Sequence, residues 1–261
     1  MTAEPAIRAT GLRKRYGPLT ALDGVDLEIG HGEVFALLGP NGAGKTTTVE
    51  ILEGYRHRDE GTVSVLGADP AHAGRPWRAR IGIVLQSSGR LELTVAELVS
   101  QFACFFPRPR DPAEVIELVG LTAQASRRAD RLSGGQRRRL DVALGIVGRP
   151  DLLFLDEPTT GFDPEARRQF WDLVRQLAGD GTTIVLTTHY LEEAEALADR
   201  VAVVAAGRVV ALGAPAALGG RDARAHRSAG RRQQAGGRCR PTRPPPWWPN
   251  SSPRKAASCR A

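Results

Sequence analysis

Two hydrophobic patterns alternate along residues 1–218. Continuous apolar runs at 33–38, 152–155 and 182–186 have the length of strands that are buried on both faces. Segments such as 164–177, in which apolar residues recur at helical spacing, lie between these runs. Because buried strands that alternate with helices form sheets covered on both sides, the pattern predicts an α/β fold with a mostly parallel sheet.

The first thirty residues carry a different pattern, in which polar residues interrupt short strand-like runs. The runs at 7–12 and 22–29 are separated by a Tyr-Gly-Pro turn signal, and a similar run follows at 62–67. We therefore expect a small N-terminal antiparallel β subdomain beside the strand at 33–38. A further strand is expected immediately before Gln86.

The middle of the chain predicts helices. Thr94 and Glu97 form the S/T-x-x-E start signal of a helix whose apolar spacing continues until Pro107. Asp111, which precedes a proline, opens another helix. Short helices placed between strands predict a helical subdomain inserted at about 88–150.

The charge of the chain is unevenly distributed. The 261 residues carry a formal net charge of +7, yet residues 219–261 alone hold 11 basic residues and one acidic residue, so residues 1–218 have a net charge of −3. Residues 219–261 also lack Leu, Ile, Val, Met, Phe and Tyr, and cannot bury enough apolar surface to offset the entropy of folding. We expect one folded domain over 1–218 without specific nucleic-acid binding, followed by a disordered basic tail.

Two explanations of the 219–261 segment stay open. Its Arg, Pro, Ala and Gly have GC-rich codons, which is the composition expected of a frameshift product, translated out of frame from a GC-rich gene. The alternative is a basic tail that binds anionic lipid or nucleic acid and is anchored by Trp247 and Trp248.

The chain offers no sign of membrane insertion or secretion. No apolar run approaches the length of about 18 residues that a spanning helix needs. Glu4 and Arg8 lie where a signal peptide would be apolar. Cys104, in an apolar helical stretch, is expected to be a small core residue of a reduced cytosolic protein.

One segment predicts a phosphate-binding loop: Gly39-Pro40-Asn41-Gly42-Ala43-Gly44-Lys45-Thr46 matches the pattern G-x-x-x-x-G-K-[ST]. The glycines let the backbone direct successive N–H groups at phosphate oxygens, and the helix that follows adds its positive end. Lys45 would reach the β and γ phosphates, and the Thr46 hydroxyl would ligate Mg²⁺. A chance match is the alternative, but the strand before the loop and the helix after it favour a nucleoside triphosphate site.

A pair of carboxylates ends the apolar strand at 152–155. Asp156 is placed to hold Mg²⁺ through its water shell, and Glu157 to polarise the water that attacks the γ phosphate. Paired acids at the end of a strand are also common as solvated loop residues, so the pair leaves both interpretations open.

A second candidate anion site lies upstream, at Leu132-Ser133-Gly134-Gly135-Gln136. Ser133 can cap the helix that follows, Gln136 completes a capping box, and the two glycines leave backbone amides open to a phosphate. A plain helix N-cap satisfies the same pattern, and these residues alone do not separate the two.

In this order and spacing the motifs resemble those of the nucleotide-binding domain of ABC transporters, and the resemblance covers residues 6 to about 218. The phosphate loop matches the Walker A motif, 132–136 the LSGGQ signature, and 152–157 the Walker B motif with its glutamate. The resemblance implies a P-loop NTPase core with the two subdomains described above, and ATP with Mg²⁺ as its ligands.

The resemblance also implies roles for residues that no pattern singles out. Tyr16 is similar to the aromatic residue on which adenine stacks, and Gln86 to the glutamine of the Q-loop. Asp163 matches the D-loop aspartate, although Phe162 stands where Leu is commoner, and His189 matches the switch histidine. The implied site consists of the catalytic residues Glu157 and His189, the metal ligands Thr46, Gln86 and Asp156, and the nucleotide contacts Tyr16, Gly39, Pro40, Asn41, Gly42, Ala43, Gly44, Lys45, Thr46, Thr47, Ser133, Gly134, Gly135, Gln136 and Asp163.

The mechanism of the family implies two partners. A second copy of the chain would face the first head to tail, with two ATP molecules between the Walker A loop of one copy and the LSGGQ helix of the other. One chain has two phosphate sites, so Ser133 and the Gly135 amide need the ATP of a partner. The other implied partner is a separate transmembrane permease, docked against the helical subdomain and the Q-loop region, which would hold the chain peripherally at the cytoplasmic face of the membrane.

Within the family, residues 138–143 and 152–164 look most like ATP-binding subunits of drug exporters of the daunorubicin-resistance type. This resemblance implies an ATPase that powers export of a drug-like or other small molecule, and a role in antibiotic resistance. The alternative is a soluble, non-transport ABC ATPase acting on a ribosome or a nucleic-acid complex. Such proteins carry two ABC domains in one chain or long heptads, and neither is present here.

Overall fold

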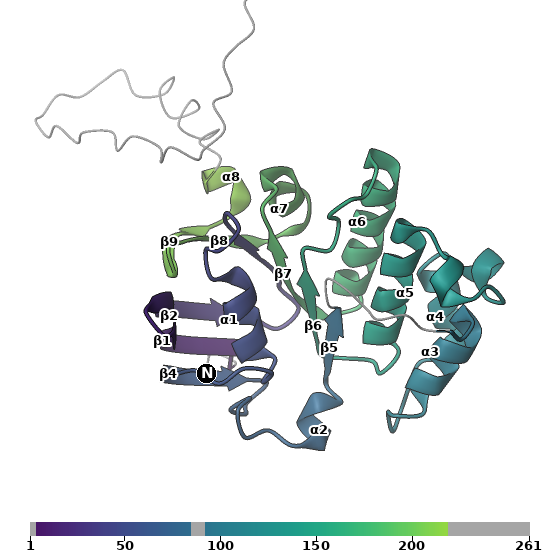
Figure 1. Cartoon of the computed structure of the whole chain (residues 1–261), viewed down its shortest axis with the longest axis horizontal. Coiled ribbons are helices and arrows are strands. Elements are labelled where there is room, and N and C mark those ends of the chain that lie inside the picture. The colour runs from purple at the N-terminus through teal and green to yellow at the C-terminus, as the bar shows by residue number, and fades with distance from the viewer. Residues whose placement is uncertain (1–3, 85–91, 219–261) are drawn as a thin grey trace, which may run out of the picture. The chain divides into compact units, whose positions relative to one another are not determined.

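The computed structural model describes residues 4–84 and 92–218. Within these ranges the strands form two sheets (Figure 1). The smaller sheet is antiparallel, in the order β2-β1-β4, and consists of β1 (Ile7–Tyr16), β2 (Leu19–Ile29) and β4 (Glu60–Val65). The larger sheet has the order β5-β6-β7-β3-β8-β9 and consists of β3 (Val34–Leu38), β5 (Ile81–Val84), β6 (Leu152–Asp156), β7 (Thr183–Thr188), β8 (Arg200–Ala205) and β9 (Arg208–Gly213).

Every neighbouring pair in the larger sheet is parallel except β8 with β9, which form an antiparallel hairpin. The predicted α/β class, with a mostly parallel sheet and a small N-terminal antiparallel sheet, is therefore confirmed. The α-helices of the described residues are α1 (Lys45–Leu52), α2 (Arg75–Arg78), α3 (Val95–Ala103), α4 (Pro112–Leu118), α5 (Gly134–Ile146), α6 (Pro164–Gly179), α7 (Leu191–Leu197) and α8 (Pro215–Leu218), and two short 3-10 helices lie at Thr122–Gln124 and Ala129–Arg131.

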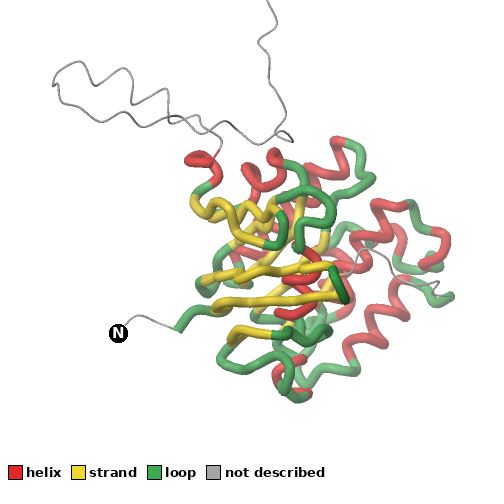
Figure 2. Tube along the Cα trace, turned by 60° about the vertical axis from the view of Figure 1, so that its left-hand side comes forward, coloured by secondary structure: helices red, strands yellow, loops and turns green. Residues whose placement is uncertain are grey.

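The larger sheet is buried on both faces, as its continuous apolar strands predict. In β3, Val34, Ala36 and Leu38 join a core formed with the helices α3 to α7. Phe35 and Leu37 point to the other side, into a second core shared with the smaller sheet and α1. Successive residues of a strand face opposite sides, so one five-residue strand contributes to both cores. Figure 2 shows the strands of the smaller sheet beside the larger one.

The strand register brings three loops together at the carboxyl-terminal end of the larger sheet. Leu38, the last residue of β3, pairs with Thr188, and Asp156, the last residue of β6, pairs with Thr187. The strands β6, β7 and β3 thus end at the same level. In open α/β sheets, ligands bind outside the carboxyl ends of the strands. The register therefore indicates this end of the sheet as the candidate site.

The helices α3, α4 and α5 lie between β5 and β6 in the chain and group together beside α6 (Figure 1). Two start signals are observed as predicted. Thr94 makes a capping box with Glu97, and the Asp111 side chain accepts a hydrogen bond from the first turn of α4.

One prediction in this region is wrong. The helix α3 ends at Ala103, before Pro107, and Cys104 is exposed and not a core residue. The buried face of α3 carries Val95, Leu98, Val99 and Ala103. Because successive helical residues are rotated by about 100° about the axis, the position after Ala103 turns away from that face.

Two predicted features lie outside the described residues. They are Gln86 and the 219–261 segment.

Candidate functional site

The loop between β3 and α1 approaches its neighbours too closely for side chains. A Cβ atom at Gly39 would lie 2.2 Å from the carbonyl oxygen of Val204. Gly44 has a φ of +105°, and a Cβ there would lie 2.7 Å from the carbonyl oxygen of Ala21. Packing therefore requires glycine at both ends of the loop, and at Gly44 the positive φ requires it as well. Since α1 begins at Lys45, its first-turn N–H groups, which have no acceptor inside the helix, open toward this loop.

Lys45 is buried beneath the loop, with only 4% of its surface exposed. Its Nζ donates hydrogen bonds to the carbonyl oxygens of Gly39, at 2.8 Å, and Pro40, at 3.1 Å. It also lies 3.7 Å from Oε1 of Glu157. Burial lowers the pKa of Lys45, and the nearby charge of Glu157 opposes that shift. An ammonium group held in this way is ready to exchange carbonyl partners for a stronger anionic one.

Glu157 occupies a strained position directly after β6. Its φ is +44°, in the left-handed region that a non-glycine residue adopts at a cost of about 1–3 kcal/mol. Its backbone N–H donates hydrogen bonds to the carbonyl oxygen and to the hydroxyl oxygen of Thr187 on β7, with N···O distances of 3.2 Å and 3.0 Å. The same hydroxyl donates a hydrogen bond to the Asp156 carboxylate. Thr187 thus holds both acids, and the backbone turn directs Glu157 toward Lys45 and not along the strand.

His189 completes this cluster from the end of β7. Its Nδ1 lies 3.4 Å from Oε1 of Glu157, the same oxygen that faces Lys45. The hydroxyl of Thr160 donates a hydrogen bond of 3.3 Å to the other carboxylate oxygen. A single carboxylate is therefore placed between a buried ammonium group and an imidazole.

A cavity of about 380 Å³ lies over this cluster. It is lined by Tyr16, Leu19, Thr20, Ala21, Asn41, Gly42, Gly44, Lys45, Thr46, Thr47, Asp156 and Glu157. Tyr16 reaches it from the end of β1, and the guanidinium carbon of Arg56 lies 5.3 Å from the centre of its ring. The smaller sheet thus adds an aromatic wall to a polar pocket built by the larger one.

The donor set of the cavity fits a hard cation. The Thr46 hydroxyl and the Asp156 carboxylate line it together, and both are oxygen ligands of the kind that Mg²⁺ prefers. Gln86, the third predicted metal ligand, lies outside the described residues. No cluster of three or more His, Cys, Asp or Glu side chains occurs in the described ranges, so a protein-only metal cage is not seen there.

Gly39, Pro40, Ala43 and His189 belong to the loop and cluster described above, although they do not line the cavity itself. Five other predicted residues lie at helix starts and do not line it either. Ser133 caps α5, its Oγ accepting a 3.3 Å hydrogen bond from the Gln136 N–H while Oε1 of Gln136 accepts one from the Ser133 N–H. Asp163 caps α6, where the N–H groups of Ala166 and Glu165 lower the pKa of its carboxyl group. Within one chain, Ser133, Gly134, Gly135, Gln136 and Asp163 thus lie at helix starts and do not line the cavity above Lys45.

Arg138 is a functional candidate that the sequence did not reveal. It lies on α5, is 7% exposed, and donates hydrogen bonds to the carbonyl oxygens of Asp156, at 2.6 Å, and Pro158, at 3.1 Å. Burial lowers its pKa. Arg138 therefore connects the helix that begins at Ser133 with the strand end that carries both acids. It stands in a run of three arginines, and only the fold distinguishes it from its neighbours.

Thr187 was missed as well. Nothing in the apolar pattern of its strand marks the one hydroxyl that holds Asp156 and the Glu157 backbone.

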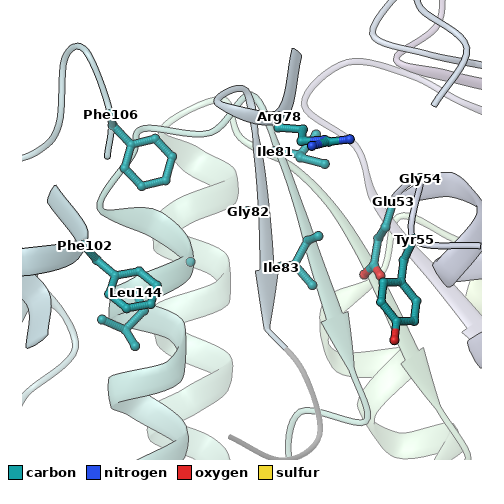
Figure 3. A pocket seen from close by; sticks show the side chains of 11 residues that line it. Glu53, Gly54, Tyr55, Arg78, Ile81, Gly82, Ile83, Phe102, Phe106 and Leu144 are labelled. Carbon is teal, nitrogen blue, oxygen red and sulfur yellow. The ribbon is translucent and has the colours of Figure 1, made fainter. Parts of the chain in front are cut away.

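A second cavity, of about 460 Å³, lies over the free edge of β5 (Figure 3). Phe102, Phe106 and Leu144 line it from the helical insertion, and Glu53, Gly54 and Tyr55 line it from the end of α1. Ile83 lies between these two groups in Figure 3. The remaining lining residues are Arg78, Ile81, Gly82 and Gly145. We call this cavity the edge groove.

Glu53 is the buried acid of the edge groove, with 8% of its surface exposed. Burial raises the pKa of its carboxyl group to about 8, and the negative charges of Asp156 and Glu50 add to the shift. A carboxyl group in this position is mainly neutral at pH 7 unless a cation is supplied.

Comparison with known proteins shows a clear relationship. Residues 22–160 match the family model described as ABC transporter. The daunorubicin resistance ATP-binding protein DrrA3 of Streptomyces coeruleorubidus is 44% identical over 213 residues, which are 79% of this chain and 67% of the relative. DrrA2 of the same organism is 47% identical over 209 residues, covering 78% and 65%. The Nod factor export ATP-binding protein I of Ralstonia nicotianae is 44% identical over 212 residues, covering 78% and 65%.

The chain spans about two thirds of the length of these relatives. Among solved structures, the ADP conformation of MJ1267, an ATP-binding cassette of an ABC transporter, superimposes with a TM-score of 0.72 at 25% identity, covering 81% of this chain and 92% of that one. The structure of cbiO1 from Clostridium perfringens gives a TM-score of 0.77 at 26% identity, covering 88% and 96%. Across residues 4–84 and 92–218, no helix has both the length and the apolar character needed to cross a membrane.

The position of Glu53 predicts a pH-dependent stability. Its pKa is about 8 in the folded chain against 4.5 for the free side chain, so the folded state binds more protons between these values and loses stability as the pH rises. Relative to Glu53→Gln, the wild-type free energy of unfolding should fall by up to about 1.4 kcal/mol per pH unit from about pH 5 to about pH 8. Urea unfolding across this range measures the difference. Glu117→Gln, which removes an exposed carboxyl group on α4, should follow the wild type, and parallel curves for wild type and Glu53→Gln would contradict the prediction.

Proposed function

The chain belongs to the ABC transporter family, and from this premise we propose that it is the ATP-hydrolysing subunit of an exporter whose membrane permease is a separate polypeptide. The observation that carries the proposal is the convergence at Glu157. Its Oε1 lies 3.7 Å from Nζ of Lys45 and 3.4 Å from Nδ1 of His189, beside the phosphate-binding loop. A nucleoside triphosphate in the cavity would meet a phosphate cradle, a buried cation and a carboxylate on one side.

In the proposed reaction, Lys45 changes partners when ATP binds. Its bonds to the Gly39 and Pro40 carbonyl oxygens give way to the β and γ phosphates, which are fully charged acceptors. The release of Lys45 from Glu157 leaves that carboxylate free to accept a proton from water. The water oxygen then bonds to the γ phosphorus as the bond to the β-phosphate oxygen breaks, and ADP and phosphate result.

His189 and Tyr16 would assist at the two ends of the nucleotide. His189, beside Glu157, can donate a hydrogen bond to the γ phosphate. Tyr16 offers a ring face on which adenine can stack. Mg²⁺, held by the Thr46 hydroxyl, Asp156 and Gln86, would neutralise charge on the phosphates.

The proposal requires a second copy of the chain. Ser133, Gly134, Gly135 and Gln136 form a helix start with open amides, yet they do not line the cavity above Lys45. A head-to-tail dimer would place this helix start, and Asp163, against the ATP bound by the partner copy. Arg138 would then couple a movement of this helix to the position of Asp156 within the same chain, through its hydrogen bond to the Asp156 carbonyl oxygen.

The permease is expected at the edge groove, which lies between the nucleotide-binding core and the helical insertion. Its apolar walls and exposed strand edge are the features of a protein-docking site and not of a polar catalytic pocket. The relatives include a daunorubicin resistance protein and a Nod factor export protein, so the cargo we propose is a drug-like or other small molecule leaving the cell, as in antibiotic resistance. The chain would then be peripheral at the cytoplasmic face of the membrane. A soluble ATPase acting on ribosomes or nucleic acid is not favoured by these relatives.

Glu157→Gln should bind ATP but hydrolyse it at least about 100-fold more slowly, because an amide cannot accept the proton of the attacking water. The variant should accumulate as an ATP-bound dimer. Phosphate release and light scattering after size-exclusion chromatography measure the two effects. Glu192→Gln, an exposed carboxyl group on α7, is the matched control. Wild-type turnover in Glu157→Gln would remove Glu157 from the catalytic role.

A mixing experiment tests the shared pocket. Lys45→Ala removes the phosphate cation and Ser133→Arg blocks the helix start, so each variant alone should lose turnover and Lys45→Ala should also lose ATP affinity. When the two are mixed, each mixed dimer contains one pocket with both an intact Lys45 and an intact Ser133. ATP turnover should therefore reappear on mixing, in proportion to the mixed dimer formed. Full turnover by a strictly monomeric wild-type chain would contradict the proposal.

Copurification distinguishes the two classes of partner. Affinity purification of the tagged chain from detergent-solubilised membranes should recover a polytopic membrane protein in stoichiometric amount. Cosedimentation with ribosomes, and none with membranes, would instead support the non-transport alternative.

A further inference from the structure

Glu53 is placed where a carboxylate is unfavourable in three ways. It directly follows the last residue of α1, at the end of the helix that carries partial negative charge. It is 8% exposed. The charged groups that act on it most are two other carboxylates, Asp156 and Glu50. An acid in such a place calls for a ligand that compensates all three effects.

The described residues do not provide that ligand. Glu50, one turn earlier on α1, already pairs with Arg56 at 2.5 Å. Arg78 lines the same groove, but it forms no ion pair with Glu53 among the described residues. Tyr55, whose side chain is 78% exposed, lies next to the Glu53 carboxylate at the mouth of the groove in Figure 3.

Apart from Arg78 and Tyr55, the other side chains that line the groove are apolar. Phe102, Phe106 and Leu144 form the wall opposite Glu53, and Ile83 is exposed between them and the acid (Figure 3). Gly82 and Gly145 pack so closely that a Cβ at Gly82 would lie 2.3 Å from the Gly145 carbonyl oxygen, which lets α5 approach the strand edge. An occupant that fits must therefore bring apolar side chains and one positive charge. The negative charges of Asp156 and Glu50, which act on Glu53, disfavour an anionic occupant beside it.

We propose that Glu53 is the anionic subsite through which the edge groove selects its permease, by pairing with one Lys or Arg that projects from a short apolar segment of that subunit. This inference rests on the proposed function, because it takes the permease as the occupant of the groove. A carboxylate that is buried alone is unfavourable, and pairing with a cation compensates this cost through a charge-assisted hydrogen bond. The surrounding apolar side chains shield that bond from water.

Pairing with a cation changes the protonation of the Glu53 carboxyl group. A cation next to Glu53 favours its charged form, so docking near neutral pH releases a proton from the carboxyl group. Binding should therefore strengthen as the pH rises through about 8. The other ionisable groups near Glu53, namely Asp156, Glu50 with Arg56, Arg78 and Tyr55, are the same for every occupant and do not distinguish a cationic one from a neutral one.

The test uses the full chain and two amidated peptides of about 14 residues, long enough to form a helix on the surface. Both carry leucines at helical spacing, and they differ at one central position, which is lysine in one and norleucine in the other. Fluorescence anisotropy measures their dissociation constants. The wild-type chain should bind the lysine peptide at least about tenfold more tightly, as one buried charge-assisted contact provides.

Glu53→Gln should reduce this preference to within about twofold and remove its pH dependence, because the charge is lost while the shape is kept. The matched control is Glu50→Gln, one turn away and already paired, which should keep the preference. Phe102→Ala should weaken both peptides equally, since it removes only apolar surface.

Equal binding of the two peptides to the wild type, a lysine preference that survives in Glu53→Gln, or no binding of either peptide would overturn the proposal. The ATP turnover of the wild-type chain, and its dependence on protein concentration, are measured on the same preparation. An inactive wild type would refute the proposed function, whereas an active wild type without lysine preference would refute the role of Glu53 alone.

Discussion

The position of the whole site depends on the parallel register of β6, β7 and β3. Because Asp156 pairs with Thr187 and Leu38 pairs with Thr188, three strands end at one level and their loops meet. A shift of this register by one residue would reverse the faces of each strand and separate the phosphate-binding loop from the acids. The register is secured by strands that are buried on both faces, in which any slip would expose apolar side chains.

The burial of ionisable side chains is the second constraint, and Lys45 and Glu53 are buried in different surroundings. Lys45 is buried but supplied with two carbonyl oxygens and a nearby carboxylate, so its charge is retained and available to a phosphate. Glu53 is buried without such partners among the described residues, and its carboxyl group is shifted toward the neutral form. Lys45 thus has partners for its charge within the chain, whereas Glu53 has none among the described residues.

The two groups lie at opposite ends of α1. Lys45 is the first residue of the helix and Glu53 directly follows its last, so a rigid segment of roughly 12 Å joins the phosphate-binding loop to the edge groove. Arg138 makes a second connection, from the helix start at Ser133 to the strand end at Asp156. In the proposed function, contacts of this kind would let the nucleotide, the second copy and the permease act on one small core.

The sequence alone determined the features that depend on local chemistry. Apolar runs predicted the buried strands, capping boxes marked the starts of α3 and α5, and the glycine pattern located the phosphate-binding loop, because each of these is set by neighbours a few residues apart. It did not determine which side chains would be buried together. Cys104 turned out to be exposed because its position is rotated away from the buried face of α3. Arg138 and Thr187 became partners of Asp156 only through contacts between distant segments. The burial of Glu53 was likewise decided by the tertiary structure, since the groove that it lines is formed by segments distant in the sequence, namely the end of α1, β5 and the helical insertion.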